Sequence, residues 1–317
     1  MSASEIDVSH IVSVYNRHDL LPDTVAGLLA QTGPLRREFI FVDDNSPDTS
    51  VTVLKELAAG RDDIRILENR DNRGPSVRLN QGARAARGRV LHFLDHDDIV
   101  PANAVRIMRD ALVTHTADLA YGRWEKTGAP ARDLIGRTVP EPVSAAISDD
   151  PLRTILKGRY RRMCLLVTRE TYLAAGGADE NVFIQDESMP LRLARVARRL
   201  VTLDAVVNLV PRTEGNLSEN RSQLNHDRFL AHYDMLRDFP DLPRDIRATI
   251  ARKALSAGWK EKRLRDGAKA FLAPVLWAYL GNDLVRGMPD MGRLEALAAW
   301  FAALPGVRHA RPAGAAA

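Results

Sequence analysis

The chain has 317 residues, of which 45% are hydrophobic and 27% are charged, a composition typical of a soluble globular protein. This length suits one large α/β domain with an extension, or two modest domains. A single cysteine excludes an internal disulfide framework, and no uncharged apolar run reaches the ~20 residues that a membrane span needs. The first ten residues lack the basic and apolar regions of a secretory signal, so we expect a cytoplasmic protein.

The formal net charge of +4 is distributed unevenly along the chain. Residues 244–317 contain 13 Lys and Arg against 6 Asp and Glu, a net charge of +7, whereas residues 1–243 contain 32 against 35. The basic excess therefore belongs to the C-terminal segment and indicates a partner for it. We expect a catalytic-type α/β domain over residues 1–243 and a basic, aromatic-containing helical extension over residues 244–317.

Strands and helices are expected to alternate along the first part of the chain. Apolar, β-branched runs predict strands, and apolar residues at helical spacing predict the helices between them. The expected strands cover residues 8–14, 39–42, 64–67 and 90–94, followed by strands in DLAYGRW, MCLLVTRE and LVTLDAVVNLV. Such alternation implies parallel pairing through right-handed crossovers. Residues 127–150 show little periodicity and are expected to form a long functional loop.

The strongest chemical signal is the stretch RVLHFLDHDDIVP, in which a short apolar strand runs into Asp95, Asp97 and Asp98. Ligands of open α/β sheets bind beyond the carboxyl ends of the strands. Three close carboxylates repel one another unless a cation lies among them, and hard oxygen ligands suit Mg²⁺ or Mn²⁺. The alternative is that Asp98 opens the helix expected at residues 102–112. Because a cap needs one carboxylate rather than three, the stretch favours a metal site.

Two further acidic turns accompany this one. Asp43 and Asp44 follow the second expected strand, and Asp186 and Glu187 open a later helix. The alternative for the first pair is an Asx-turn or a cap, and for Asp186 an N-cap. Three acidic turns in one alternating α/β chain suggest a single shared site.

Four motifs in consistent order resemble the family 2 glycosyltransferases, which have the GT-A fold. VSVYNRHDLLPDTVAGLLAQT resembles the opening strand, loop and helix of the family, and FVDDNSPDTS its second-strand motif. NRDNRGPSVRLNQGARAARGRVLHFLDHDD is similar to the run into its DxD element, and GGADENVFIQDESMPLRLA to its late acidic segment. The resemblance covers residues 8–210. It implies a Rossmann-like, mostly parallel sheet flanked by helices, with the C-terminal helices as an extension.

The resemblance implies roles for individual residues. The positions expected at the nucleotide sugar are Ser13, Tyr15, Asn16, Arg17, Asp43, Asp44, Asn72, Arg78, Asp95 and His96. Among them Asp44 is implied at the base and Arg78 near the phosphates. His96 is interpreted as a spacer in the motif, although an imidazole can also reach a metal.

The metal and the catalytic base are implied in the same way. Asp97 matches the principal ligand of Mn²⁺ or Mg²⁺, with Asp95 beside it and His226 as a late ligand. The alternative for His226 is a residue on a helix surface. Asp186 matches the base that removes the proton of the acceptor hydroxyl. The residues on either side of Asp186 depart from the family pattern, which leaves Glu187 as the alternative base.

We therefore expect an inverting, metal-dependent hexosyltransferase that adds single sugars, because the Gln-x-x-Arg-Trp motif and the membrane spans of processive synthases are missing. Its expected partners are a nucleotide-diphosphate sugar, with a UDP-sugar as first choice, and a glycan or lipid-linked acceptor in cell-surface glycan synthesis. No nucleic-acid partner is expected. The alternatives are a nucleotidyltransferase, for which the Gly-rich phosphate loop is missing, and a non-catalytic glycan-binding or scaffold protein with a decayed site.

The C-terminal segment mixes Lys and Arg with Trp259, Phe271, Trp277 and Tyr279. This pattern is typical of a helix that lies on an anionic membrane surface. The alternative is an appendix that packs its aromatic residues on the catalytic domain or on a second subunit. Peripheral contact with the inner membrane face and a homodimer through these helices are both compatible with the sequence.

Overall fold

The chain forms two compact units in the computed structural model, which describes residues 6–158, 160, 162–211, 220–285 and 290–308. The first, here called the sheet unit, comprises residues 1–178 and 192–214. The second, here called the helical unit, comprises residues 179–191 and 215–317. The domain border expected after residue 243 stays a prediction, because compactness alone does not show which part of a chain folds independently.

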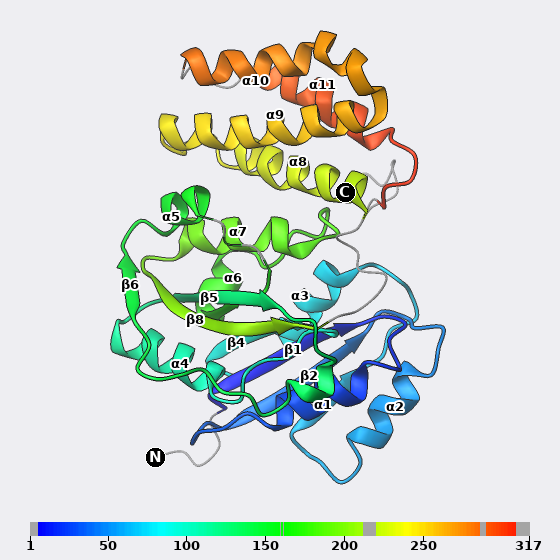
Figure 1. The fold of residues 1–317 in the computed structure, drawn as a ribbon, viewed down its shortest axis with the longest axis vertical. Coiled ribbons are helices and arrows are strands. Elements are labelled where there is room, and N and C mark those ends of the chain that lie inside the picture. The colour runs from blue at the N-terminus through cyan, green and yellow to red at the C-terminus, as the bar shows by residue number, and fades with distance from the viewer. Residues whose placement is uncertain (1–5, 159, 161, 212–219, 286–289, 309–317) are drawn as a thin grey trace. The chain divides into compact units, whose positions relative to one another are not determined.

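Within its described residues, the sheet unit contains an eight-stranded sheet with helices on both faces (Figure 1). The strands follow the order β3-β2-β1-β4-β7-β5-β8-β6. The pairings within β3-β2-β1-β4 and the pairing of β5 with β8 are parallel, while β7 and β6 run antiparallel to their neighbours. The strands are β1 (Val8–Val14), β2 (Arg37–Asp43), β3 (Ile64–Leu67), β4 (Val90–Asp95), β5 (Leu119–Lys126), β6 (Ala145–Ser148), β7 (Leu165–Thr168) and β8 (Leu200–Val210). The expected α/β class with a mostly parallel sheet is confirmed.

The helices of the sheet unit connect these strands and cover the sheet. They are α1 (Leu21–Leu29), α2 (Ser50–Leu57), α3 (Pro75–Ala85), α4 (Ala104–Thr114), α5 (Pro151–Lys157), α6 (Arg169–Ala174) and the later part of α7 (Met189–Val196). Helix α3 packs on β1 and β2, and α4 packs on β5 and β8. A Cβ atom on Gly82 of α3 would lie 2.5 Å from Cγ2 of Ile11. The missing side chain therefore lets this helix lie close against β1.

The central strands are buried on both faces, as expected for parallel strands that are covered by helices. All seven residues of β1 are buried, and Ile11, Ile40 and Phe93 have no exposed surface. Polar residues concentrate where the strands end, with Asp43 closing β2 and Asp95 closing β4. The apolar core thus fixes the strands and leaves their carboxyl ends for chemistry.

The prediction of a long loop over residues 127–150 is wrong in part. The structure places a short 3₁₀ helix, η1 (Ala131–Asp133), and the strand β6 in this stretch. β6 pairs antiparallel with β8 at the edge of the sheet. A strand of four residues is too short to show a periodic pattern in the sequence, and its partner β8 lies more than 50 residues further along the chain.

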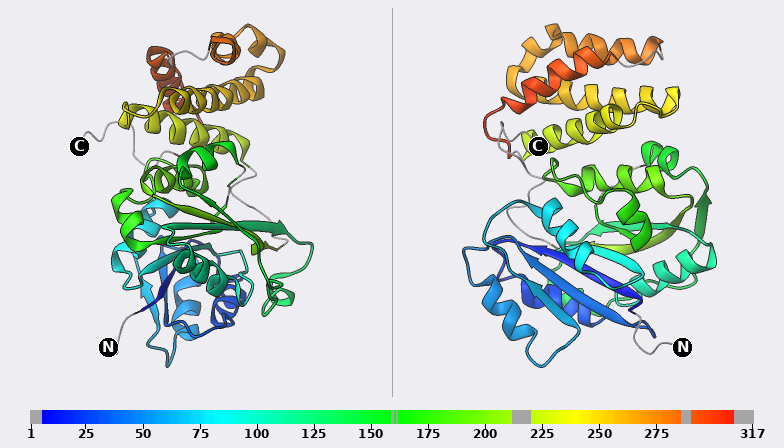
Figure 2. Two further views of the ribbon diagram at one scale, coloured as in Figure 1. Left: turned by 90° about the vertical axis from the view of Figure 1, so that its left-hand side faces the viewer. Right: turned by 180° about the vertical axis from the view of Figure 1, so that it is seen from behind.

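The helical unit is built from long helices that pack side by side (Figure 2). They are α8 (Arg221–Asp238), α9 (Arg244–Asp266), α10 (Pro274–Val285) and α11 (Met291–Ala302), with the 3₁₀ helices η2 (Gln185–Glu187) and η4 (Gly267–Leu272). Helix α9 packs against both α8 and α10, and Phe229 of α8 stacks on Phe301 of α11 at 4.8 Å between ring centroids. Of the helices described, none combines the length and the apolar character needed to cross a bilayer.

Two histidines face each other in the core of the sheet unit. His10 of β1 and His92 of β4 are register partners, and their Nδ1 atoms lie 3.0 Å apart. Burial lowers the pKa of His92 to about 4, and burial together with the neighbouring His92 lowers the pKa of His10 well below its ordinary value. Both rings are therefore neutral in the folded protein at neutral pH, and one Nδ1–H donates to the other.

This pair makes stability depend on pH. Below pH 6.5 the unfolded chain binds protons that the folded chain excludes, so stability falls as the pH drops from 6.5 toward 4. His92 alone is expected to remove about 2 kcal/mol of unfolding free energy between pH 7 and pH 5. Urea denaturation at the two pH values measures this loss. The double variant His10→Leu/His92→Leu is expected to lose less stability over that range, and an unchanged pH dependence would contradict the assignment.

Candidate functional site

Three neighbouring parallel strands of the sheet unit end at one edge. The register pairs Ser13 of β1 with Asp95 of β4, and Val14 of β1 with Asp43 of β2. The backbone N–H of Asp44 then donates to the carbonyl of Val14 at 2.8 Å. The structure therefore brings together the residues that the sequence placed at the ends of β1, β2 and β4, at the edge where α/β sheets bind ligands.

The loop after β1 is fastened to the loop after β2. The backbone N–H groups of Asn16 and Arg17 donate to the hydroxyls of Ser46 and Ser50, each at 3.0 Å. Asn16 has a φ of 54°, in the left-handed region that asparagine tolerates better than most residues. Tyr15, just before it, is half-buried. The segment predicted to contact the nucleotide is thus held by side chains of the neighbouring loop.

Asp44 is the centre of a buried ion pair. Its Oδ1 accepts from Nε of Arg78 at 2.6 Å and from the backbone N–H of Arg73 at 2.8 Å, and its Oδ2 accepts from the backbone N–H of Gly74 at 2.8 Å. The two side chains are only 5% and 4% exposed. Arg78 also donates to Asp71. Asp44 and Arg78 therefore fix the turn that precedes α3, and Asn72 lies exposed in that turn.

Asp43 forms a turn with its side chain, the alternative to a ligand-binding role that the sequence leaves open. Both of its carboxylate oxygens accept from the backbone N–H of Ser46, at 3.1 and 3.3 Å, and the residue is 2% exposed. The contact shapes the loop after β2. The nucleotide-binding roles of Asp43, Asp44, Asn72 and Arg78 stay predictions.

His96 does more than space the acidic residues around it. Nε of Arg17 donates to its Nε2 at 3.1 Å, and its Nδ1 lies 3.1 Å from the carbonyl oxygen of Ser13. These contacts require a neutral ring with its proton on Nδ1, which donates to Ser13. Burial lowers the pKa of His96, although the charge of Asp97 opposes this effect. The imidazole links the turn after β4 to β1 and to the loop after it.

Asp98 is not a helix cap. The N-cap residue of α4 is Asn103, which makes no side-chain cap hydrogen bond, and Asp98 has no exposed surface. Its Oδ2 accepts from Nδ2 of Asn208 at 2.6 Å, and Arg162 lies 3.7 Å away. Burial, reinforced by the charges of Asp97 and Asp95, raises the pKa of the Asp98 carboxyl well above its ordinary value. Asn208 was missed from the sequence, although it is a buried amide in an apolar strand.

Asp95 and Asp97 present carboxylates at the end of β4. Asp97 is half-buried, and within the described residues no hydrogen bond or ion pair to its carboxylate occurs. Nor does that part of the chain contain a group of three or more His, Cys, Asp or Glu side chains arranged to hold a metal ion. Mg²⁺ usually binds through one or two carboxylates and completes its shell with water and substrate phosphates. The two aspartates fit such a shared site.

The predicted base residues lie in the helical unit. Asp186 and Glu187 belong to η2, and Glu187 accepts from Nε of Arg228 on α8 at 3.0 Å. The backbone N–H of Ile184, which precedes η2, donates to Asp227 at 2.7 Å. Contacts with α8 thus hold this acidic turn. The expected convergence of Asp186 with the strand ends stays a prediction.

His226 is buried in the helical unit. It is 1% exposed, its Nδ1 lies 2.7 Å from Oδ1 of Asp227, and its ring meets the edge of Phe301. The alternative of a helix-surface residue is therefore wrong. The metal role implied for His226 stays a prediction.

The stability of the folded chain is expected to depend on the buried Asp44–Arg78 pair. Asp44→Ala leaves a buried guanidinium without its main counter-charge, so we expect a loss of about 3–5 kcal/mol in unfolding free energy. Asp63→Ala is the matched control, because Asp63 is paired with Arg61 and both side chains are about a third exposed. That variant is expected to lose less than about 1 kcal/mol. Equal losses in chemical denaturation would contradict a structural role for the buried pair.

Comparisons with known proteins agree with this geometry. Residues 9–149 match the family model described as glycosyl transferase family 2. The poly(ribitol-phosphate) beta-glucosyltransferase of Bacillus spizizenii is 26% identical over 145 residues, which are 45% of this chain and 22% of that protein. The chain covers 22–38% of the length of this relative and of two further curated relatives.

Two solved structures show the same fold. Residues 1–349 of S. aureus TarS in complex with UDP-GlcNAc superpose with a TM-score of 0.66 at 17% identity, covering 92% of this chain and 84% of that one. The mannosyltransferase PcManGT from Pyrobaculum calidifontis, in complex with GDP-Man and Mn²⁺, has a TM-score of 0.55 at 18% identity and covers 94% and 87%. The expected GT-A fold is confirmed. Residues 9–149, which contain the converging ends of β1, β2 and β4, thus match the family 2 glycosyltransferases.

Proposed function

We propose that this chain is an inverting, metal-dependent glycosyltransferase that moves a single sugar from a nucleotide-diphosphate sugar to an acceptor hydroxyl. The observation that carries the proposal is the common edge at which β1, β2 and β4 end, with Ser13 next to the last residue of β1 and with Asp43 and Asp95 as the last residues of β2 and β4. This edge lies within the segment that matches the family. The nucleotide sugars bound to TarS and PcManGT support a donor of this class, with a UDP-sugar as first choice.

The two loops beside this edge suit a donor. Side chains of the second loop fasten the Tyr15–Arg17 segment, so its backbone is held before a ligand arrives. The buried Asp44–Arg78 pair fixes the 71–74 turn beside it. We assign nucleotide contacts to these two segments.

Asp97 and Asp95 would hold the divalent cation. When bound there, Mn²⁺ or Mg²⁺ would stabilise the charge that develops on the departing diphosphate. The Asp97 carboxylate suits this role because its half-buried oxygens accept no hydrogen bond from the described residues. The Mn²⁺ in the PcManGT complex supports a metal in a protein of this fold.

We assign the base role to Asp186 rather than to Glu187. The Glu187 carboxylate is engaged by Arg228, and the two side chains are 11% and 18% exposed. This ion pair gives Glu187 a structural role, because it holds the acidic turn on α8. Asp186 would take the proton of the acceptor hydroxyl as it attacks the anomeric carbon, a contribution of about 10²–10⁴ in rate. One base and one displacement step give inversion.

The acceptor proposed is a cell-surface glycan or its lipid-linked precursor. The matched relative from Bacillus spizizenii is named for poly(ribitol-phosphate), a polymer that supports this class. A nucleotidyltransferase is disfavoured because the similar proteins include a glucosyltransferase and a mannosyltransferase.

Substitution of the cation ligand tests the proposal. A panel of UDP-, GDP- and dTDP-sugars, screened by thermal stabilisation with Mn²⁺, first identifies the donor. Asp97→Asn is then expected to slow release of the nucleoside diphosphate at least about a hundredfold, because the developing charge loses its stabilisation. Asp62→Asn, an exposed carboxylate before β3, is the matched control and keeps wild-type rates. Equal rates in the two variants would refute the metal role.

Donor binding without turnover in the wild type would favour the scaffold alternative.

A second pair of variants tests the base. Asp186→Asn is expected to lower kcat by about 10²–10⁴ while the Kd for the donor stays near that of the wild type. Glu187→Gln removes the partner of Arg228 and is expected to have a smaller effect on kcat. Titration of the donor by calorimetry and steady-state kinetics give the two readouts. The reverse order of effects would transfer the base role to Glu187.

A further inference from the structure

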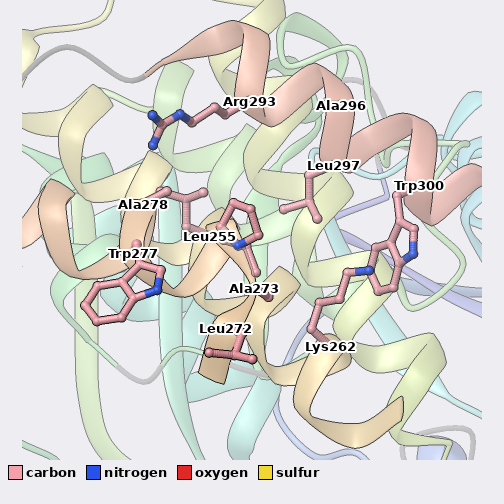
Figure 3. A pocket seen from close by; sticks show the side chains of 12 residues that line it. Leu255, Lys262, Leu272, Ala273, Trp277, Ala278, Arg293, Ala296, Leu297 and Trp300 are labelled. Atoms are coloured by element: carbon pink, nitrogen blue, oxygen red, sulfur yellow. The ribbon is translucent and has the colours of Figure 1, made fainter. Parts of the chain in front are cut away.

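A wide groove opens among the C-terminal helices of the helical unit. It lies between α9, η4, α10 and α11 and has a volume of about 590 Å³. Its walls are mostly apolar, and Figure 3 shows Trp277 across the groove from Trp300. Lys262 lies over the Trp300 ring, 3.9 Å from its centroid. The groove therefore combines apolar walls with cationic groups at its rim.

Large apolar side chains are exposed along the stretch of chain that includes Leu272 and Trp277 of this groove. Nine large hydrophobic residues are exposed in the described part of the chain, and five of them fall within residues 264–280. We call these five the apolar elbow: Leu264, Phe271, Leu272, Trp277 and Leu280. Leu272 is 82% exposed and Trp277 62%. Exposed apolar residues gathered in this way mark an interaction surface rather than the scattered exposure of an ordinary surface.

The same stretch carries positive charge. Lys262, Arg263, Arg265 and Lys269 lie within eight residues of chain, and Asp266 is the only exposed acidic residue described among them. Glu261 has no exposed surface, and it is bonded to Arg265 and to Asn225. The stretch that contains the apolar elbow therefore carries more basic than acidic exposed residues.

The positive charge of this stretch distinguishes between two candidate partners, a second copy of the chain and an anionic bilayer. A second copy of this chain that docked through the same face would bring like charges together, because a two-fold interface repeats the same patch on both sides. An anionic bilayer supplies the opposite charge for Lys and Arg, and its headgroup boundary receives Trp, Phe and Leu. We propose that the apolar elbow docks on the surface of an anionic phospholipid bilayer. Leu272 and Trp277 enter the boundary between headgroups and acyl chains, and Arg263 and Lys269 contact the headgroups.

This inference goes beyond the proposed function and does not depend on it. The elbow lies in the helical unit, outside the segment that matches the family. A failure of sugar transfer would therefore leave vesicle binding intact, and a failure of vesicle binding would leave transfer to a water-soluble acceptor intact.

Co-sedimentation of the full chain with vesicles tests the proposal. Binding is expected to vesicles that contain phosphatidylglycerol and to be at least about tenfold weaker to pure phosphatidylcholine, because the basic residues lose their counter-charges. Leu272→Ser/Trp277→Ser is expected to lower binding at least about tenfold. Ile147→Ser/Leu173→Ser is the matched control, since both side chains are exposed apolar residues of the sheet unit. It is expected to bind like the wild type.

A charge variant provides an independent readout. Arg263→Gln/Lys269→Gln replaces two exposed cations and is expected to weaken binding to phosphatidylglycerol vesicles while leaving the weak binding to phosphatidylcholine unchanged. Circular dichroism verifies that each variant is folded, and this variant decides the outcome should the apolar one fail to fold. Equal sedimentation of wild type and variants would overturn the proposal. Absence of vesicle binding together with a dimer in light scattering that Leu272→Ser/Trp277→Ser abolishes would assign the elbow to a second copy.

Discussion

The parallel register of β1 with β2 and β4 is the constraint on which the candidate site depends. It pairs Ser13 with Asp95 and Val14 with Asp43, so that three polar strand ends lie at one edge. Packing enforces this register, because β1 is buried on both faces and a shift by one residue would exchange the side chains that pack against each face. The acidic residues at the edge repel one another, and the apolar strands behind them resist that repulsion.

Hydrogen bonds between neighbouring loops extend this order to the edge itself. Ser46 and Ser50 hold the loop after β1, the Asp44–Arg78 pair holds the turn before α3, and His96 joins Ser13 to Arg17. Most of these bonds connect side chains to backbone N–H or C=O groups, which fixes loops without regular structure. Preorganisation of this kind lowers the entropy cost of binding a flexible nucleotide sugar.

Much of the sheet unit could be predicted from the sequence, because its central strands are locally encoded. The apolar run predicted β1 at residues 8–14, and the structure has Val8–Val14. Contacts between distant parts of the chain could not be predicted in this way. Asp98 meets Asn208 from 110 residues away, and Arg17 meets His96 from 79 residues away. Each contact depends on strand order and register, which no local pattern contains.

The central claim is that the shared ends of β1, β2 and β4 form the donor site. A crystal structure of the chain with its nucleotide sugar and Mn²⁺ tests this claim most directly. We expect the diphosphate and the cation beside Asp97, with the nucleoside against the Tyr15–Arg17 segment. A nucleotide bound elsewhere, for example in the groove among α9, α10 and α11, with the ends of these three strands empty, would contradict it.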